Sequence, residues 1–550
     1  MARYPHCEAQ SGLGVLQGQT KSRFNAAPCH DVDFYPYTLP GVDPVFAVCG
    51  DHYTVICRCI LQKDSTIEVI RWFEHDHVQA SETPYEYNSV AWSRADNGDP
   101  LVCVTGGVSQ IRVLNVRTGE LVQTLIGHGD AINDLTVSPV DPTILASASI
   151  DYSVRIWSLH PSHKKQPLAA ICYGQGHKDQ VLTLAYHRQG RYLLSAGMDT
   201  KVNLWTVPDN VTDNAGTDKP AMIHYPHFST TEVHTDFIDR VQWYNDLILS
   251  HAAREDHILL WRIDKFSSDR LETPPPPIPT SAAVNSKTPV TVPADSTSNT
   301  RSAWGGRFQR LLKFDLPHCG IYYLRFSLFH EMGRHPMLVA GNERSRAFFW
   351  DLQRIEETHV GEDGMQYDVS DALPLSLPRH VRESSTSTAS SAVSAGSGTT
   401  TKTKRNKIKG LPRDRGLGDP FQPIKAHKSI EVPKYQAFPF YKFAWSRDGQ
   451  WCVGVGSPSL INVFHRWKDG VPPPTTEESV GVPAREIKPQ YNKQRFFDDL
   501  TEIRTAYELR KQLADDAGMP FEEIFNETLE TFVEGLPPLA RDFVRSLEDQ

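Results

Sequence analysis

The sequence predicts an all-β protein, a seven-bladed β-propeller in which four-stranded sheets close into a ring. Three observations predict it. Residues 127–157 and 176–205 align with each other over their whole length, each holds short runs of alternating apolar and polar residues between turns, and weaker copies lie on both sides. Antiparallel units repeated in this way are typical of radial β architectures, whose closure removes exposed sheet edges.

The composition favours a globular core diluted by polar inserts. Of 550 residues, 39% are hydrophobic and 22% are charged, and the formal net charge of -9 argues against a general basic field for nucleic acid. The 9 cysteines are odd in number, scattered and never in a CxxC pair, which fits neither a disulfide framework nor a metal site. Without a run of signal-peptide or membrane-spanning length, we expect a soluble intracellular protein.

The two clearest units share polar residues at matched offsets. Each begins with Gly-His and ends with Trp, and an Asp precedes that Trp by six residues. This spacing resembles the hydrogen-bonded tetrad of WD repeats, in which a buried indole finds partners through Ser, His and Asp. A Ser-His-Asp hydrolase is the alternative, but a catalytic triad needs one copy and an oxyanion hole. The predicted structural tetrads are His128, Ser147, Asp151 and Trp157, and His177, Ser195, Asp199 and Trp205.

Weaker copies of the unit bring the blade count to seven. Residues 322–352 end in the Trp350-Asp351 pair, and 87–125, 441–467 and a strand pair over 45–60 supply further blades. One more copy, over 233–261, keeps His234, Asp239, Ser250, Asp256 and Trp261.

Composition also divides the chain into regions. We expect a flexible segment over 1–35, the propeller over 36–470 and a helical tail over 490–550, where apolar residues follow helical spacing. Pro, Ser and Thr mark inserts that we expect to be loops or disordered: 208–230, 264–318 and 376–420. The basic run over 402–410 is either a nuclear-import signal or a solvated loop.

Four stretches resemble one particular family. GHGDAIND with DPTILASASIDYSVRIW, AGMDTKVNLW, DRVQWYNDLILS and IYYLRFSLFHEMGRHPMLVAGNERSRAFFWDL are similar to the embryonic ectoderm development family, called extra sex combs in insects. The similarity runs from about Pro44 to Trp467, excluding the inserts. Because the inserts and tail look unlike animal members, we expect a fungal-type member.

The resemblance implies a non-catalytic nuclear subunit of Polycomb repressive complex 2. Members bind the histone H3 tail carrying trimethyl-lysine, contact a SET-domain methyltransferase subunit and a zinc-finger subunit, and stimulate methylation; nucleic acid is met only indirectly. The sequence also lacks a Gly-rich phosphate loop and an HExxH motif, so we expect no enzyme activity and no cofactor. Another WD-repeat scaffold, such as a ubiquitin-ligase substrate receptor, is the alternative.

A trimethylammonium group keeps its charge but has no N–H, so aromatic faces must recognise it by cation–π attraction. The resemblance places such a cage at Phe46, Tyr322 and Tyr323, with Arg325 beside them. Arg325 either lines a central channel and touches the peptide or is a buried arginine satisfied by carbonyls.

One cage position departs from the family pattern. Counting back from Ala91-Trp92 places Asn88 where the family has a tyrosine, with Tyr87 one residue earlier and Tyr85 as a second candidate. A shift of one residue turns a side chain to the other face of a strand, so Tyr87 serves only if a bulge re-aims it. Ordinary core packing is the alternative for every aromatic residue in a propeller strand.

Overall fold

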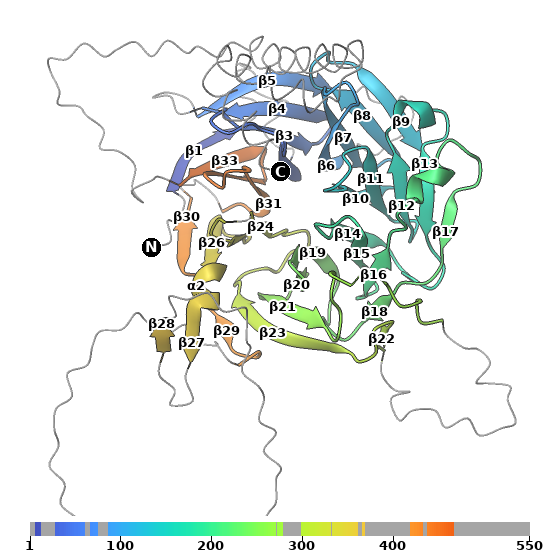
Figure 1. The fold of residues 1–550 in the computed structure, drawn as a ribbon. Coiled ribbons are helices and arrows are strands. Elements are labelled where there is room, and N and C mark those ends of the chain that lie inside the picture. Colours follow the sequence, from blue (N-terminus) through green and yellow to red (C-terminus); the bar gives the residue numbers. More distant parts are fainter. Residues whose placement is uncertain are drawn as a thin grey trace, which may run out of the picture.

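In its described residues the structure, a computed structural model, contains seven β-sheets of four or five strands arranged around a common centre, as the sequence predicted, and a separate two-stranded sheet (Figure 1). It describes residues 6–12, 28–60, 66–74, 86–270, 272–278, 299–331, 333–360, 366–368, 419–432 and 437–466. Within these residues no helix is long and apolar enough to cross a membrane.

Each sheet, or blade, begins with its innermost strand, and the first strands of neighbouring blades pack on one another. Blade 1 consists of β2 (Asp31–Phe34), β3 (Val45–Gly50), β4 (Tyr53–Cys59) and β5 (Ile67–Glu74), and blade 2 of β6 (Tyr87–Arg94), β7 (Pro100–Gly106), β8 (Gln110–Asn115) and β9 (Leu121–Ile126). Blade 3 consists of β10 (Ile132–Val137), β11 (Ile144–Ser149), β12 (Val154–Ser158) and β13 (Leu168–Cys172), and blade 4 of β14 (Val181–Tyr186), β15 (Tyr192–Gly197), β16 (Val202–Thr206) and β18 (Phe228–Thr230).

Blades 5 to 7 follow the same plan. Blade 5 consists of β19 (Ile238–Tyr244), β20 (Leu247–Ala252), β21 (His257–Ile263) and β23 (Phe308–Asp315). Blade 6 consists of β24 (Ser327–Phe329), β25 (Met337–Gly341), β26 (Arg346–Asp351) and β30 (Lys428–Glu431). Blade 7 consists of β31 (Phe440–Trp445), β32 (Trp451–Gly456), β33 (Leu460–His465) and β1 (His6–Gly12). Short elements between them are η1 (Pro161–His163), η2 (Val211–Asn214), β17 (Ala221–Ile223), β22 (Arg301–Ser302), α2 (Leu352–Glu357), β27 (Thr358–Val360), β28 (Gln366–Asp368) and β29 (Pro423–Ile424).

The ring is closed by the two ends of the propeller. Strand β1 pairs antiparallel with β33, so blade 7 takes its outer strand from the start of the chain (Figure 1). The prediction of a flexible segment over 1–35 therefore needs correction at 6–12 and at 31–34, where β2 begins blade 1. The sequence did not reveal β1 because its pairing rests on backbone hydrogen bonds and HCEAQSG carries no alternating apolar pattern.

Two of the inserts, and the segment that follows the third, differ from the prediction because each sends a strand back to the preceding blade. Strand β17 pairs with β13 of blade 3, β22 with β18 of blade 4, and β29 with β23 of blade 5. The predicted loops over 208–230 and 264–318 thus contain β17, β18, β22 and β23. Strands β17, β22 and β29 cover backbone groups that an outer edge leaves unpaired, and at two or three residues each they are too short to show a sequence period. Residues 279–298 and 376–418, and the tail over 490–550, lie outside the described residues.

In blades 2, 4 and 7 a glycine at the end of the second strand lets the chain pass close by. A Cβ added at Gly106 would lie 2.0 Å from the carbonyl oxygen of Glu86, and one at Gly197 would lie 2.0 Å from that of Gln180. A Cβ added at Gly456 would lie 2.1 Å from the carbonyl oxygen of Pro439. In these three blades only a residue without a side chain fits there, so the glycine allows the segment before the inner strand to approach closely as it enters the hub.

Both predicted tetrads are present with short hydrogen bonds. Trp157 Nε1 donates to Ser147 Oγ at 2.8 Å, His128 Nε2 lies 2.7 Å from the same oxygen, and His128 Nδ1 lies 2.8 Å from the Asp151 carboxylate. Burial would raise the pKa of Asp151, but the hydrogen bond from His128 holds it below its ordinary value. The second tetrad repeats these contacts at 2.8, 2.7 and 3.0 Å.

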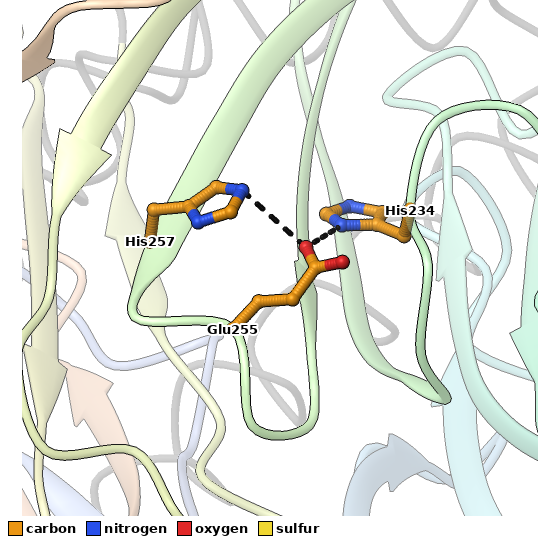
Figure 2. Close-up of side chains that lie close together, drawn as sticks. All are labelled: His234, Glu255 and His257. Atoms are coloured by element: carbon orange, nitrogen blue, oxygen red, sulfur yellow. Dashed lines mark hydrogen bonds and ion pairs between the residues drawn. The ribbon is translucent and has the colours of Figure 1, made fainter.

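A third tetrad in blade 5 corrects the sequence assignment. Glu255, and not Asp256, accepts from His234 Nδ1 at 2.6 Å, while Ser250 Oγ lies 2.7 Å from Nε2. Figure 2 shows Glu255 between His234 and His257, whose Nε2 lies 3.3 Å from the carboxylate. Glu255 precedes Trp261 by six residues, so the spacing seen in the first two units identified the carboxylate better than its residue type did.

The tetrad tryptophans should carry much of the stability. We expect Trp205→Ala to lower the free energy of unfolding by roughly 3–5 kcal/mol, because the cavity remains within a close-packed core. Chemical denaturation of the full chain measures this, and Tyr152→Ala, a change at a 42% exposed side chain, serves as control with an effect within about 0.5 kcal/mol. Equal midpoints for Trp205→Ala and wild type would contradict the tetrad's structural role.

Closure by β1 makes a second prediction. Deleting residues 1–12 leaves the β33 edge unpaired. It should lower the free energy of unfolding by about 3 kcal/mol, since each lost hydrogen bond contributes about 1 kcal/mol. Deleting residues 1–5, which precede β1, is the matched control. An unchanged denaturation midpoint after removal of 1–12 would show that the ring closes without this strand.

Candidate functional site

Each inner strand places one residue at an equivalent register position near the centre. We call this set the inner ring; its members are Asp31, Ser89, Asp134, Thr183, Arg240, Arg325 and Lys442. Two of its carboxylates link neighbouring blades: Asp31 Oδ2 accepts from the Val90 backbone N–H at 3.0 Å, and Asp134 Oδ2 from that of Leu184 at 2.8 Å. The inner ring therefore ties the blades together at the hub.

Arg325 spans the hub from blade 6 to blade 3. Its Nη1 lies 2.9 Å from Asp134 Oδ1, and its Nη2 donates to the Leu182 carbonyl of blade 4 at 2.9 Å. The side chain is fully buried. Burial would lower the pKa of Arg325, but the Asp134 carboxylate brings it above its ordinary value, so the guanidinium stays charged. Arg325 is therefore the buried arginine of the two interpretations, with a carboxylate and carbonyls as its partners. The expected direct contact between Arg325 and a peptide does not agree with this burial.

A β-bulge precedes the inner ring in five blades. The pairing of β6, β10, β14, β19 and β31 shifts by one residue there, and the bulged residues are Asn88, Asn133, Leu182, Asp239 and Tyr441. His30 stands in the same place in blade 1, directly before Asp31. Because these residues all precede the inner ring, they lie at one end of the hub.

Tyr323 is fixed rigidly at this end of the hub. Its backbone N–H donates to Asp239 Oδ2 at 2.8 Å, its hydroxyl donates to the Asn133 carbonyl at 2.7 Å, and the Arg325 guanidinium lies 4.3 Å from its ring centroid. Its φ of +76° is a strained conformation for a bulky residue. Such strain persists only where the surroundings over-determine it, and it gathers at functional sites.

Tyr322, the neighbour of Tyr323, points outward. Its side chain is 60% exposed, and its ring stands at 88° to that of Tyr323, with the centroids 6.4 Å apart. Burial raises the pKa of the Tyr323 phenol, so this hydroxyl remains a hydrogen-bond donor within the protein. The adjacent pair thus combines an anchored ring with a solvent-facing one.

His30 and Tyr441 add two further rings that the sequence did not identify. Their centroids are 5.3 Å apart, and the Tyr441 carbonyl accepts from the Arg325 backbone N–H at 2.7 Å, which brings this segment against the Tyr322–Tyr323 pair. Burial is the largest cause that raises the pKa of Tyr441. The nearby side chains of Glu86 and Tyr322 raise it further. We call His30, Tyr322, Tyr323 and Tyr441 the aromatic cluster.

The carboxylate of Glu86 borders the aromatic cluster. It lies 3.0 Å from His30 Nε2, and its side chain is 49% exposed against 16% for His30. The hydrogen bond from His30 lowers the pKa of Glu86, which therefore stays ionised. Rings and one accessible anion in the same place suit a cationic ligand.

Two predicted cage residues do not belong to this site. Phe46 is fully buried in β3, where its ring packs 5.4 Å from Phe34. Tyr87 is 7% exposed and lies in the core between blades 1 and 2. The bulge that Tyr87 required is present, but Tyr87 still points inward. The equivalent residue before the blade 3 bulge, Ile132, is buried and apolar, so Tyr87 occupies a core position of the blade. Tyr85 lies outside the described residues.

The strand pairing shows which positions supply the missing rings. Aligning the inner strands on their bulges puts His30, Asn88 and Tyr441 at the same position, one residue before the inner ring. Asn88 fills the blade 2 position and offers an amide in place of a ring. The site therefore draws its rings from blades 1, 6 and 7.

Comparison with known proteins agrees with this fold. The family model described as "WD domain, G-beta repeat" matches residues 119–158 and 169–206. The chain is 35% identical to Polycomb protein EED of Chaetomium thermophilum, with 80% of this chain and 90% of that protein covered. It is 26% identical to Polycomb protein esc of Drosophila melanogaster, with 57% of this chain and 68% of the relative covered.

Solved structures lead to the same family. A chain in the crystal structure of Polycomb repressive complex 2 from Chaetomium thermophilum superposes with a TM-score of 0.65 and 31% identity, covering 84% of this chain and 98% of the other. The same values hold for a structure of that complex with H3K27me3. From the bladed fold, the identity and the extent of both alignments, the chain belongs to the EED family of Polycomb proteins.

Proposed function

We propose that the chain is a non-catalytic, nuclear subunit of a complex similar to Polycomb repressive complex 2, in which the aromatic cluster binds trimethyl-lysine of the histone H3 tail. The observation that carries this proposal is the convergence of His30, Tyr322 and Tyr441 beside the anchored Tyr323. Each ring contributes roughly 0.5–2 kcal/mol to binding a desolvated cation. A few rings thus support a modest affinity that responds to local histone density.

The related complexes support the proposed partners. A relative that superposes over most of the chain was solved in complex with H3K27me3, and others form part of Polycomb repressive complex 2. By this likeness the chain contacts a SET-domain methyltransferase subunit and a zinc-finger subunit. Binding of the methylated tail then favours an active state of the methyltransferase, a coupling between two sites.

The arrangement of the buried polar groups favours a binding role over a catalytic one. In the tetrads that hold them, His128, His177 and His234 each use both ring nitrogens within one blade. The Ser-His-carboxylate sets are thus occupied by the tryptophan contacts that hold the blades. Recognition falls to the exposed rings at the hub.

A methyl-specific interaction is the first prediction of this proposal. In a fluorescence anisotropy titration, the full chain should bind a trimethyl-lysine histone H3 peptide more tightly than the same peptide without methyl groups, because methylation weakens the hydration of the cation and enlarges its contact with the rings. Equal affinity for the two peptides would favour a WD-repeat scaffold of another kind, such as a ubiquitin-ligase substrate receptor.

The exposed ring of the cluster offers a cleaner substitution. We expect Tyr322→Ala to weaken binding of the trimethyl-lysine peptide roughly 2- to 30-fold, the equivalent of one cation–π contact. Thermal unfolding should stay near that of wild type, since the side chain is 60% exposed. Tyr152→Ala, at another exposed tyrosine, is the matched control and should leave affinity unchanged. Loss of affinity in both variants, or in neither, would contradict the assignment.

A further inference from the structure

Asp239 and Glu86 each form a hydrogen bond with a member of the aromatic cluster, and the surroundings of these two carboxylates differ. Asp239 is fully buried, with Oδ1 2.8 Å from His251 Nδ1 and Oδ2 accepting the Tyr323 N–H. Both carboxylate oxygens of Asp239 therefore accept hydrogen bonds from groups inside the protein. Glu86, by contrast, is about half exposed and is held by His30 Nε2 at 3.0 Å. Only Glu86, of these two, is placed to meet a ligand.

His30 is the donor in its contact with Glu86. The pKa of Glu86 lies below its ordinary value, so the carboxylate is ionised and carries no proton to donate. The proton between the two groups therefore belongs to His30 Nε2. The backbone fixes where this donor sits, because the His30 N–H donates to the Cys49 carbonyl of β3 at 3.0 Å.

The number of N–H groups separates the methylation states of lysine. Dimethyl-lysine keeps one N–H and unmethylated lysine keeps three, whereas trimethyl-lysine has none. A carboxylate free to accept such an N–H forms a charge-assisted hydrogen bond and favours the lower states. A carboxylate that already accepts a protein N–H attracts every state by its charge but gives the lower states less advantage.

We propose that His30 determines the methylation-state preference of the site: its ring forms a wall with Tyr441, and its Nε2–H binds Oε2 of Glu86, so that it competes with the N–H of dimethyl- and unmethylated lysine for this carboxylate. His30 thus contributes twice to the preference for a donor-free cation, once through its ring and once through its proton. This inference rests on the proposed function, because it concerns the ligand of the same aromatic cluster.

A double-mutant cycle on the full chain tests the inference. The proteins are wild type, His30→Phe, Glu86→Gln and the double variant, and the probes are three histone H3 peptides that differ only in a trimethylated, dimethylated or unmethylated lysine. The quantity measured is the ratio of the Kd for the dimethyl peptide to the Kd for the trimethyl peptide, at one pH and ionic strength. Phe keeps a ring at position 30 and removes the donor.

The four proteins have distinct expected ratios. His30→Phe should lower the ratio roughly 3- to 10-fold, because Glu86 becomes free to accept the dimethylammonium N–H in an exposed, solvent-screened hydrogen bond. Glu86→Gln should stay within about twofold of wild type, and the double variant should return to that range, because a neutral amide replaces the anionic acceptor of the charge-assisted hydrogen bond. A thermal melt of each variant checks folding, and His30→Leu replaces His30→Phe if the latter unfolds.

Three results would overturn the inference. The ratio could stay unchanged in both His30 variants, or it could fall equally in the single and double variants, which would remove Glu86 from the explanation. A ratio that falls in Glu86→Gln alone would reverse the assigned role. The proposed function fails separately: in that case wild type already shows no preference for the trimethylated peptide over the unmethylated one.

Discussion

The ion pair between Arg325 and Asp134 is the interaction on which the hub depends. It joins blade 6 to blade 3 across the centre of the ring, and the same guanidinium reaches a blade 4 carbonyl and covers one face of Tyr323. A buried pair of this kind adds little net stability by itself, but removing one partner leaves a charge that water cannot reach. The pair therefore fixes the position of the Arg325 guanidinium. Tyr323, which packs on this guanidinium, is held in place by its hydroxyl hydrogen bond and its strained backbone.

The protein uses one set of side-chain types for two purposes, and burial separates them. In the tetrads, His, Ser and a carboxylate lie beneath the surface and satisfy a tryptophan N–H. In the aromatic cluster, a His–carboxylate pair stands beside tyrosines at partly exposed positions. Hydrogen bonding is common to both, but only the second set leaves π-faces and charge available to a ligand.

The inserts serve the ring as well as interrupting it. Each of blades 3, 4 and 5 gains a fifth strand from a connecting segment of the next blade, so three outer edges are covered by the chain itself. Covered edges resist pairing with other chains, which is the hazard that open sheets face. The same contacts bind each blade to its successor at the rim, as the inner ring does at the hub.

The sequence by itself determined the blades, because strand period, turn residues and tetrad spacing are local patterns that the chain repeats. It identified His128 and His177 with their partners, and the resemblance pointed to Tyr322 and Tyr323, which lie beside each other at the hub. Only the tertiary structure decided which rings converge. Phe46 and Tyr87 became core because strand register and a recurring bulge aim them inward, whereas His30 and Tyr441, more than four hundred residues apart, meet because closure of the ring places blade 7 beside blade 1. Convergence of distant residues leaves no local pattern, since it arises from how blades pack around a common centre.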